Sequence, residues 1–160
     1  MNLAALWVGL LSSAVGSLGF ALIFRVRPRC LFPATLGGTL AFFVYFIFDA
    51  LGFHIFLSNF LGAVASAIFS EICARIFKAP SIVFSIPCVI PLVPGSLLYY
   101  TMSHLLEGAY SEALSYLSKT LLTALGIAGG LLVVSVFVSF SMFVRTRYAA
   151  KNRENASKEA

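Results

Sequence analysis

Apolar residues run in long blocks along this chain, and charged residues mark where the blocks end. Five blocks can be delimited in this way: 3–24, 30–48, 54–70, 82–106 and 121–144. A helix needs roughly 20 apolar residues to cross the hydrocarbon core of a bilayer, so the first and last blocks are long enough alone. The second and third are marginal, but the segment from Asp49 to His54 between them is short enough for a tight hairpin. The pattern predicts an all-α integral membrane protein with about five transmembrane helices.

The fourth block, IVFSIPCVIPLVPGSLLYYTM, contains three prolines and a Pro-Gly pair but no charged residue. Each proline removes a backbone N–H donor and clashes with the carbonyl group four residues earlier in a helix. Lipid offers the freed groups no partner, so they need protein, water or a solute. Broken helices of this kind form the binding sites of many secondary transporters. The block therefore predicts a broken fourth helix, and a kinked packing helix with Ser and Thr partners is the alternative.

The residues around this break are the candidates for solute binding or gating. We expect main-chain amides and carbonyls to face a central cavity, with serine and tyrosine side chains close enough to add hydrogen bonds. Gly95 is expected to be the closest approach of the backbone. The candidate residues are Ser85, Pro87, Pro91, Pro94, Gly95, Ser96, Tyr99 and Tyr100.

A few ionisable residues near the ends of the blocks are candidates for proton coupling or gating. Glu71 and Arg75 are four residues apart, which suits an ion pair within one helix. Ionisable groups near the membrane often belong to transport pathways, but a boundary salt bridge that fixes helix depth is the alternative. Asp49 and His54 flank the predicted hairpin, and His104 lies near the end of the fourth block. A histidine titrates near neutral pH, although many interfacial histidines have no further role.

Composition supports the membrane assignment and excludes several classes of function. Hydrophobic residues make up 60% of the 160 residues and charged residues only 11%, whereas a soluble domain carries about 25% charged residues. Cys30, Cys73 and Cys88 lie far apart and have no histidine beside them, so we expect small buried side chains rather than disulfides or a metal site. No nucleophile–base pair or phosphate-binding loop is evident, so neither an enzyme nor a cofactor is expected.

The distribution of Lys and Arg predicts the orientation. Five spans leave segments 25–29, 75–78 and the tail from residue 145 on one side, and these hold all of the eleven basic residues except Lys119. Basic residues favour the cytoplasmic side, so we expect the N-terminus outside and the C-terminus in the cytoplasm. The start of the chain lacks the basic region of a signal peptide. Residues 1–147 are thus predicted to form a five-span membrane transport domain, and 148–160 a basic, disordered cytoplasmic tail that does not bind nucleic acid.

Small residues recur at helix-packing spacing, and a short amphipathic stripe follows the fourth block. Close packing in lipid is expected along Gly9–Ser13–Ser17, Gly62–Ser66–Ser70, Gly126–Gly130 and Ser135–Ser139. The second pattern places four apolar residues at helical spacing, which predicts a separate interfacial helix on the outer side: Tyr110, Leu114, Leu117 and Leu121.

The segment EICARIFKAPSIVFSIPCVIPLVPGSLLYYTM resembles the central motif of the small membrane component of the threonine/serine exporter family. The elements that carry the resemblance are Ala74–Arg75, Lys78–Ala79–Pro80 and IPLVPG, followed by Tyr99 or Tyr100. The earlier segment FALIFRVRPRCLFPATLGG is similar to the first cytoplasmic loop and second span of that family. The resemblance covers roughly residues 1–147.

This resemblance implies export of small polar metabolites across the cell (cytoplasmic) membrane. Fused members export threonine and serine, and some split members export dicarboxylates such as succinate. It also implies a partner, a larger family subunit with a cytoplasmic N-terminal region and about five spans of its own. Two five-span halves of opposite orientation suit the inverted repeats of secondary transporters. The first hypothesis is the small subunit of a two-component exporter; the alternatives are a non-transporting subunit that stabilises a larger partner and a self-sufficient homo-oligomer.

Overall fold

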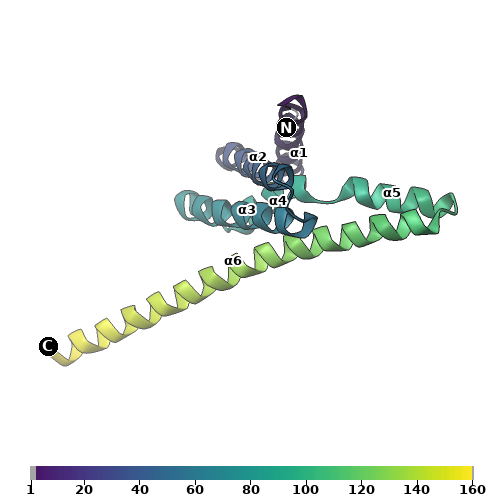
Figure 1. The fold of residues 1–160 in the computed structure, drawn as a ribbon. Helices are drawn as coiled ribbons and strands as arrows, with labels where there is room; N and C mark the ends of the chain where they lie inside the picture. Colours follow the sequence, from purple (N-terminus) through teal and green to yellow (C-terminus); the bar gives the residue numbers. More distant parts are fainter. Residues whose placement is uncertain (1–2, 160) are drawn as a thin grey trace.

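The computed structural model describes residues 3–159, with side chains described for residues 6–141. All regular elements within these residues are helical (Figure 1). Their order is α1 (Leu3–Ile23), α2 (Pro28–Ala50), α3 (Ile55–Phe77), α4 (Ile82–Val89), the 3₁₀ helix η1 (Ile90–Leu92), α5 (Gly95–Leu106) and α6 (Tyr110–Glu159).

The described helices agree with the predicted number of spans. Four are long and apolar enough to cross a membrane, within α1, α2, α3 and the Tyr110–Ser141 part of α6. The number rises to five if Ile82–Leu92 and Gly95–Leu106, which are bent by 48° relative to each other, count as one broken span. The all-α membrane class and the broken fourth span are thereby confirmed. The orientation of the spans in the membrane stays a prediction.

Short reversals connect successive helices, and each contains one residue with positive φ. These residues are Arg25 (52°), Gly52 (83°), Lys78 (51°) and Gly108 (77°). Glycine adopts this left-handed conformation without steric cost, and at Lys78 it terminates α3, with the backbone N–H of Lys78 bonded to the carbonyl of Ala74. The turns are short because each helix is stopped within one or two residues of its partner's start, which keeps neighbouring helices side by side.

Small residues allow helices α1 to α4 to approach closely. A Cβ atom at Gly38 of α2 would meet the Ser17 hydroxyl of α1 and lie 3.2 Å from the Pro87 carbonyl oxygen of α4. The predicted packing face of the third span is confirmed, since Gly62, Ser66 and Ser70 are all buried. Such faces suit a bilayer, where close van der Waals packing replaces the hydrophobic driving force between helices.

Helix α6 runs parallel to α3 and continues beyond it at both ends. A Cβ atom at Gly126 would lie 2.6 Å from the Phe56 carbonyl oxygen, and one at Gly130 would lie 2.6 Å from that of Phe60. The part of α6 before Gly126 therefore extends about 24 Å past the first turn of α3, at roughly 1.5 Å per residue. Helix α5 packs along this extension, and the two form a projecting hairpin (Figure 1).

Two predictions about this part of the chain need comment. The separate amphipathic helix was wrong, because Tyr110 to Leu121 form the first turns of the continuous helix α6. Propensity carries the helix through, since no Gly or Pro stands between Tyr110 and Leu125 to interrupt it. The helical bounds of α6 extend to Glu159 and so include most of the tail that was expected to be disordered. The division at residue 147 stays a prediction.

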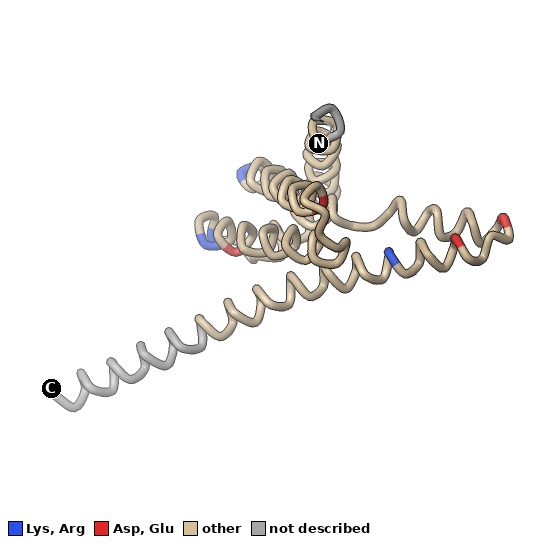
Figure 2. The backbone as a smooth tube through the Cα atoms, in the orientation of Figure 1, with Lys and Arg blue, Asp and Glu red and all other residues tan. Residues whose placement is uncertain are grey.

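Charged residues lie mainly at the ends of the described helices (Figure 2). The α1–α2 and α3–α4 turns meet, because Arg25, Arg27 and Lys78 line one surface pocket. The basic segments 25–29 and 75–78 thus share one end of the bundle, as the charge pattern required. The basic residues of the tail from Arg145 lie outside the residues whose side chains are described.

Candidate functional site

The broken span forms one wall of the candidate site. Helix α4 ends at Val89, η1 follows, and α5 begins at Gly95. Two short-range bonds close the break: the N–H of Val93 donates to the Ile90 carbonyl at 3.1 Å, and that of Gly95 to the Val93 carbonyl at 2.8 Å. Pro94, the N-cap residue of α5, has no side chain that can cap the helix. The first-turn N–H groups of α5 are therefore open to a solute.

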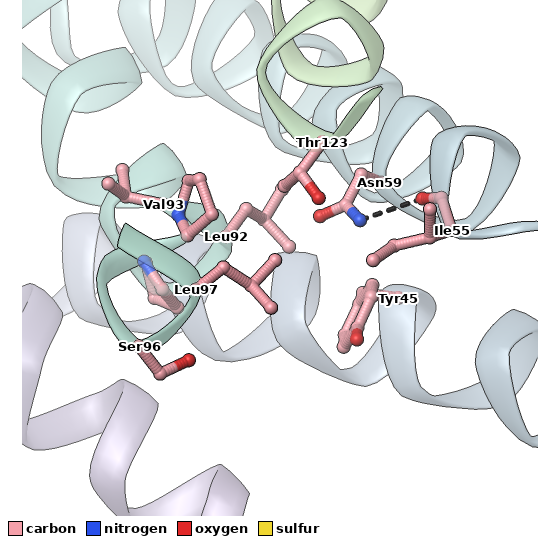
Figure 3. Close-up of a pocket in the computed structure, with 10 residues that line it drawn as sticks. Tyr45, Ile55, Asn59, Leu92, Val93, Ser96, Leu97 and Thr123 are labelled. Carbon is pink, nitrogen blue, oxygen red and sulfur yellow. Dashed lines mark hydrogen bonds between the residues drawn. The ribbon is translucent and has the colours of Figure 1, made fainter. Parts of the chain in front are cut away.

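A cavity of about 270 Å³ lies at this break (Figure 3). Three other helices contribute to it, with Tyr45 from α2, Ile55 and Asn59 from α3, and Thr123 from α6. The break itself contributes a continuous segment and the start of α5: Pro91, Leu92, Val93, Pro94, Ser96 and Leu97. We call this the outer cavity, because it lies near the end of α3 that is predicted to face outward.

Asn59 and Thr123 provide the buried polar groups of the outer cavity. Both residues are 3% exposed, and Figure 3 shows their side chains pointing toward each other. Asn59 Nδ2 donates to the Ile55 carbonyl at 2.8 Å, and the Thr123 hydroxyl donates to the Lys119 carbonyl at 2.9 Å. These bonds hold both side chains in place and leave their oxygens as acceptors toward the cavity.

A second pocket of about 250 Å³ lies between α3, α4 and α6. Serine hydroxyls and one carboxylate supply its polar lining: Ser70, Glu71, Ser81, Ser85 and Ser135. Ala67, Ile82, Leu131 and Val134 complete it. We call this the inner pocket, since it lies toward the basic end of the bundle.

The structure divides the predicted binding residues between several locations. Pro91, Pro94 and Ser96 line the outer cavity, whereas Ser85 lines the inner pocket. Pro87 is buried, with its carbonyl oxygen against α2.

Three of the predicted residues lie outside both cavities. Tyr99 and Tyr100 are 69% and 47% exposed on α5, and the ring of Tyr100 lies 5.4 Å from that of Tyr116. The expectation that Gly95 marks the closest backbone approach is wrong, since a Cβ atom there would have no neighbour within 4 Å. The physical reason is the bend, which turns the start of α5 away from α3.

The candidate ionisable residues are not brought together. Glu71 and Arg75 line one groove between α3 and α6, but among the described side chains the only ion pair joins His104 and Glu107, at 3.6 Å. His104 also stacks on Tyr116, with ring centroids 5.3 Å apart. Asp49 is exposed near the α2–α3 turn. Of these residues, only Glu71 lines a pocket that also contains a predicted binding residue, Ser85.

Sequence reasoning missed three polar residues of the outer cavity, Tyr45, Asn59 and Thr123. For Asn59 a signal was present, because it is the only amide side chain inside the five apolar blocks, and polar groups within spans are costly unless they have a role. Tyr45 and Thr123 carried no comparable signal, since tyrosine and threonine are common in transmembrane helices.

A multispan apolar helical bundle with a broken span and a polar cavity at the break is typical of membrane transporters. Residues 9–137 match the family model described as "Threonine/Serine exporter, ThrE". The chain therefore belongs to the threonine/serine exporter family, as its motif indicated. It is a cell-membrane protein of an amino-acid exporter family and a transporter rather than an enzyme. No solved structure matches the chain significantly.

Proposed function

We propose that this chain is the small subunit of a two-component secondary exporter that moves threonine, serine or a related neutral amino acid through the outer cavity. The observation that carries the proposal is the position of this cavity. It joins the open N-terminus of α5 to the buried oxygens of Asn59 and Thr123. A carboxylate suits the amides of a helix N-terminus, and the ammonium and hydroxyl groups of the solute suit the side-chain oxygens.

The charge of the lining favours a neutral zwitterion over a dicarboxylate. Among the described residues that line the outer cavity there is no Lys, Arg, Asp or Glu. A solute with two carboxylates would need cationic partners for both, because buried charges are costly unless they are paired. A zwitterion brings its own positive charge. The volume of about 270 Å³ lies at the lower end of the roughly 300–1,000 Å³ typical of ligand pockets, which suits a solute as small as an amino acid.

The projecting α5–α6 hairpin supports the need for a partner. Its exposed surface is rich in large apolar and aromatic side chains: Leu98, Tyr99, Met102, Leu105, Leu106, Tyr110, Leu114, Leu117 and Leu121. The helices α2 and α3 extend about 34 Å each, which already matches the bilayer core. Apolar surface that projects beyond them is expected to be covered by protein. We propose that the larger family subunit provides this cover.

Transport measurements in proteoliposomes test the proposal. The chain is reconstituted alone and together with a larger family subunit, and efflux of labelled threonine, serine and succinate is normalised to inserted protein. The expected result is efflux of threonine or serine by the pair only. Efflux of succinate alone would contradict the solute assignment, and efflux by the chain alone would favour a self-sufficient homo-oligomer. Efflux by the larger subunit alone at the same rate would favour a non-transporting role.

A further inference from the structure

The outer cavity and the inner pocket lie in sequence along the same two helices. Helix α3 contributes Asn59 to the first and Ser70 to the second, and α6 contributes Thr123 and Ser135. At roughly 1.5 Å per residue these pairs are about 16 Å and 18 Å apart along their helices. Because α3 and α6 are parallel, both helices place the cavities in the same order and at a similar separation.

A thin apolar layer separates the two cavities. Leu92, which is 4% exposed, lines the outer cavity and packs with Ala41 and Ala63. Leu131, which lines the inner pocket, packs against this same cluster. One cluster of side chains therefore forms the inner boundary of one cavity and the outer boundary of the other. Constrictions of this kind control passage in membrane proteins by excluding water and polar solutes.

The inner pocket has the chemistry of a second compartment for a small zwitterion. Its hydroxyl groups can donate to a carboxylate and accept from an ammonium group. Glu71 is the only charged residue among the described residues that line either cavity. A single carboxylate among hydroxyl groups suits the ammonium group of an amino acid, and it disfavours a doubly negative solute.

We propose that the outer cavity and the inner pocket are two compartments of one transport path, with Leu92 and Leu131 as the barrier between them and Glu71 as the partner of the solute ammonium group in the inner pocket. This inference rests on the proposed function for the identity of the solute, but not for the existence of the path. The path is a geometric property, and it can be tested without any transport measurement.

The test uses two reporter cysteines on the broken span, Ser96→Cys in the outer cavity and Ser85→Cys in the inner pocket. The three native cysteines are first replaced by alanine, and the complex is labelled with a membrane-impermeant thiol reagent in sealed vesicles of both orientations. The two reporters are expected to react from opposite faces of the membrane. With Leu92→Ala, Ser85→Cys should react about tenfold faster from the face that labels Ser96→Cys, which corresponds to a barrier lower by about 1.4 kcal/mol.

Controls make each outcome decisive. Leu125→Ala, at a residue that is 61% exposed and outside both cavities, should leave the labelling rates unchanged. Leu131→Ala tests the same barrier from the inner side if Leu92→Ala is not inserted. Labelling of both reporters from one face at similar rates, or of neither, would overturn the proposal, as would unchanged rates in every barrier variant that inserts.

A competition arm tests the chemistry of the inner pocket. Threonine or serine should slow the labelling of Ser85→Cys, and Glu71→Gln should weaken this protection about tenfold, which corresponds to about 1.4 kcal/mol. Protection that is equally strong with Glu71→Gln would overturn the role of Glu71. Absence of amino-acid efflux together with opposite-face labelling would refute the proposed function and leave the two-compartment path intact.

Discussion

Leu92 of the broken span packs directly over Gly62 of α3. The two Cδ atoms of Leu92 lie 3.2 and 3.3 Å from where a Cβ atom at Gly62 would be, and the carbonyl oxygen of Ala41 lies 3.1 Å from that point. The position of Leu92 therefore depends on the absence of a side chain at residue 62. Glycine is required here by space, since its φ is not in the left-handed region.

Gly62→Ala is expected to destabilise the bundle. The added methyl group must displace Leu92 or the α2 backbone, and overpacking of this kind costs about 1–3 kcal/mol. A lower midpoint of thermal unfolding in detergent would show it. The matched control is Gly16→Ala on α1, where an added Cβ has no neighbour within 4 Å. An equal or higher midpoint for Gly62→Ala than for Gly16→Ala would contradict the expectation.

Removal of the Asn59 amide is expected to reduce export. Asn59→Leu keeps the approximate size of the side chain but deletes the acceptor that faces the outer cavity, so normalised efflux of threonine and serine should fall by about tenfold or more. Thr123→Val, which loses only the hydroxyl group, should act in the same direction. Leu125→Ala serves as the control on α6. Efflux at the unmodified rate in both polar-site variants would mean that the cavity does not bind the solute.

Straightening the break is expected to impair transport more than insertion. Pro91→Ala combined with Pro94→Ala restores two backbone donors and allows α4 and α5 to join as one helix, which would remove the open amides from the outer cavity. Normalised export should fall by about tenfold or more. Gly95→Ala should be close to neutral, because nothing lies within 4 Å of the added atom. Loss of inserted protein with normal export per molecule would instead identify the break as a packing kink.

The sequence predicted the break and the number of spans better than the site. Prolines act on the backbone locally, so the positions of Pro87, Pro91 and Pro94 were sufficient to place the break. Which side chains meet at the break depends on how α3 and α6 cross it, and no local pattern encodes that crossing. Asn59 and Thr123 come together through the contacts of Gly126 and Gly130 with the α3 backbone, which follow from the tertiary arrangement.

The predicted orientation can be tested at two described positions outside the cavities. Ser111 lies at the start of α6 on the projecting hairpin, and Lys78 ends α3 at the basic end of the bundle. With the N-terminus outside, Ser111→Cys should react with an impermeant thiol reagent added to intact cells, and Lys78→Cys should react only after permeabilisation. The reverse pattern would place the C-terminus outside and contradict the positive-inside assignment.

The unbroken course of α6 has a mechanical consequence. Gly126 and Gly130 press its backbone against that of α3 between Thr123, at one cavity, and Ser135, at the other. A stiff rod held at one contact moves its two arms in opposite directions when it tilts. A small rocking of α6 about the glycine contact would thus widen one cavity as it narrows the other, so both ends of the path would not stand open together.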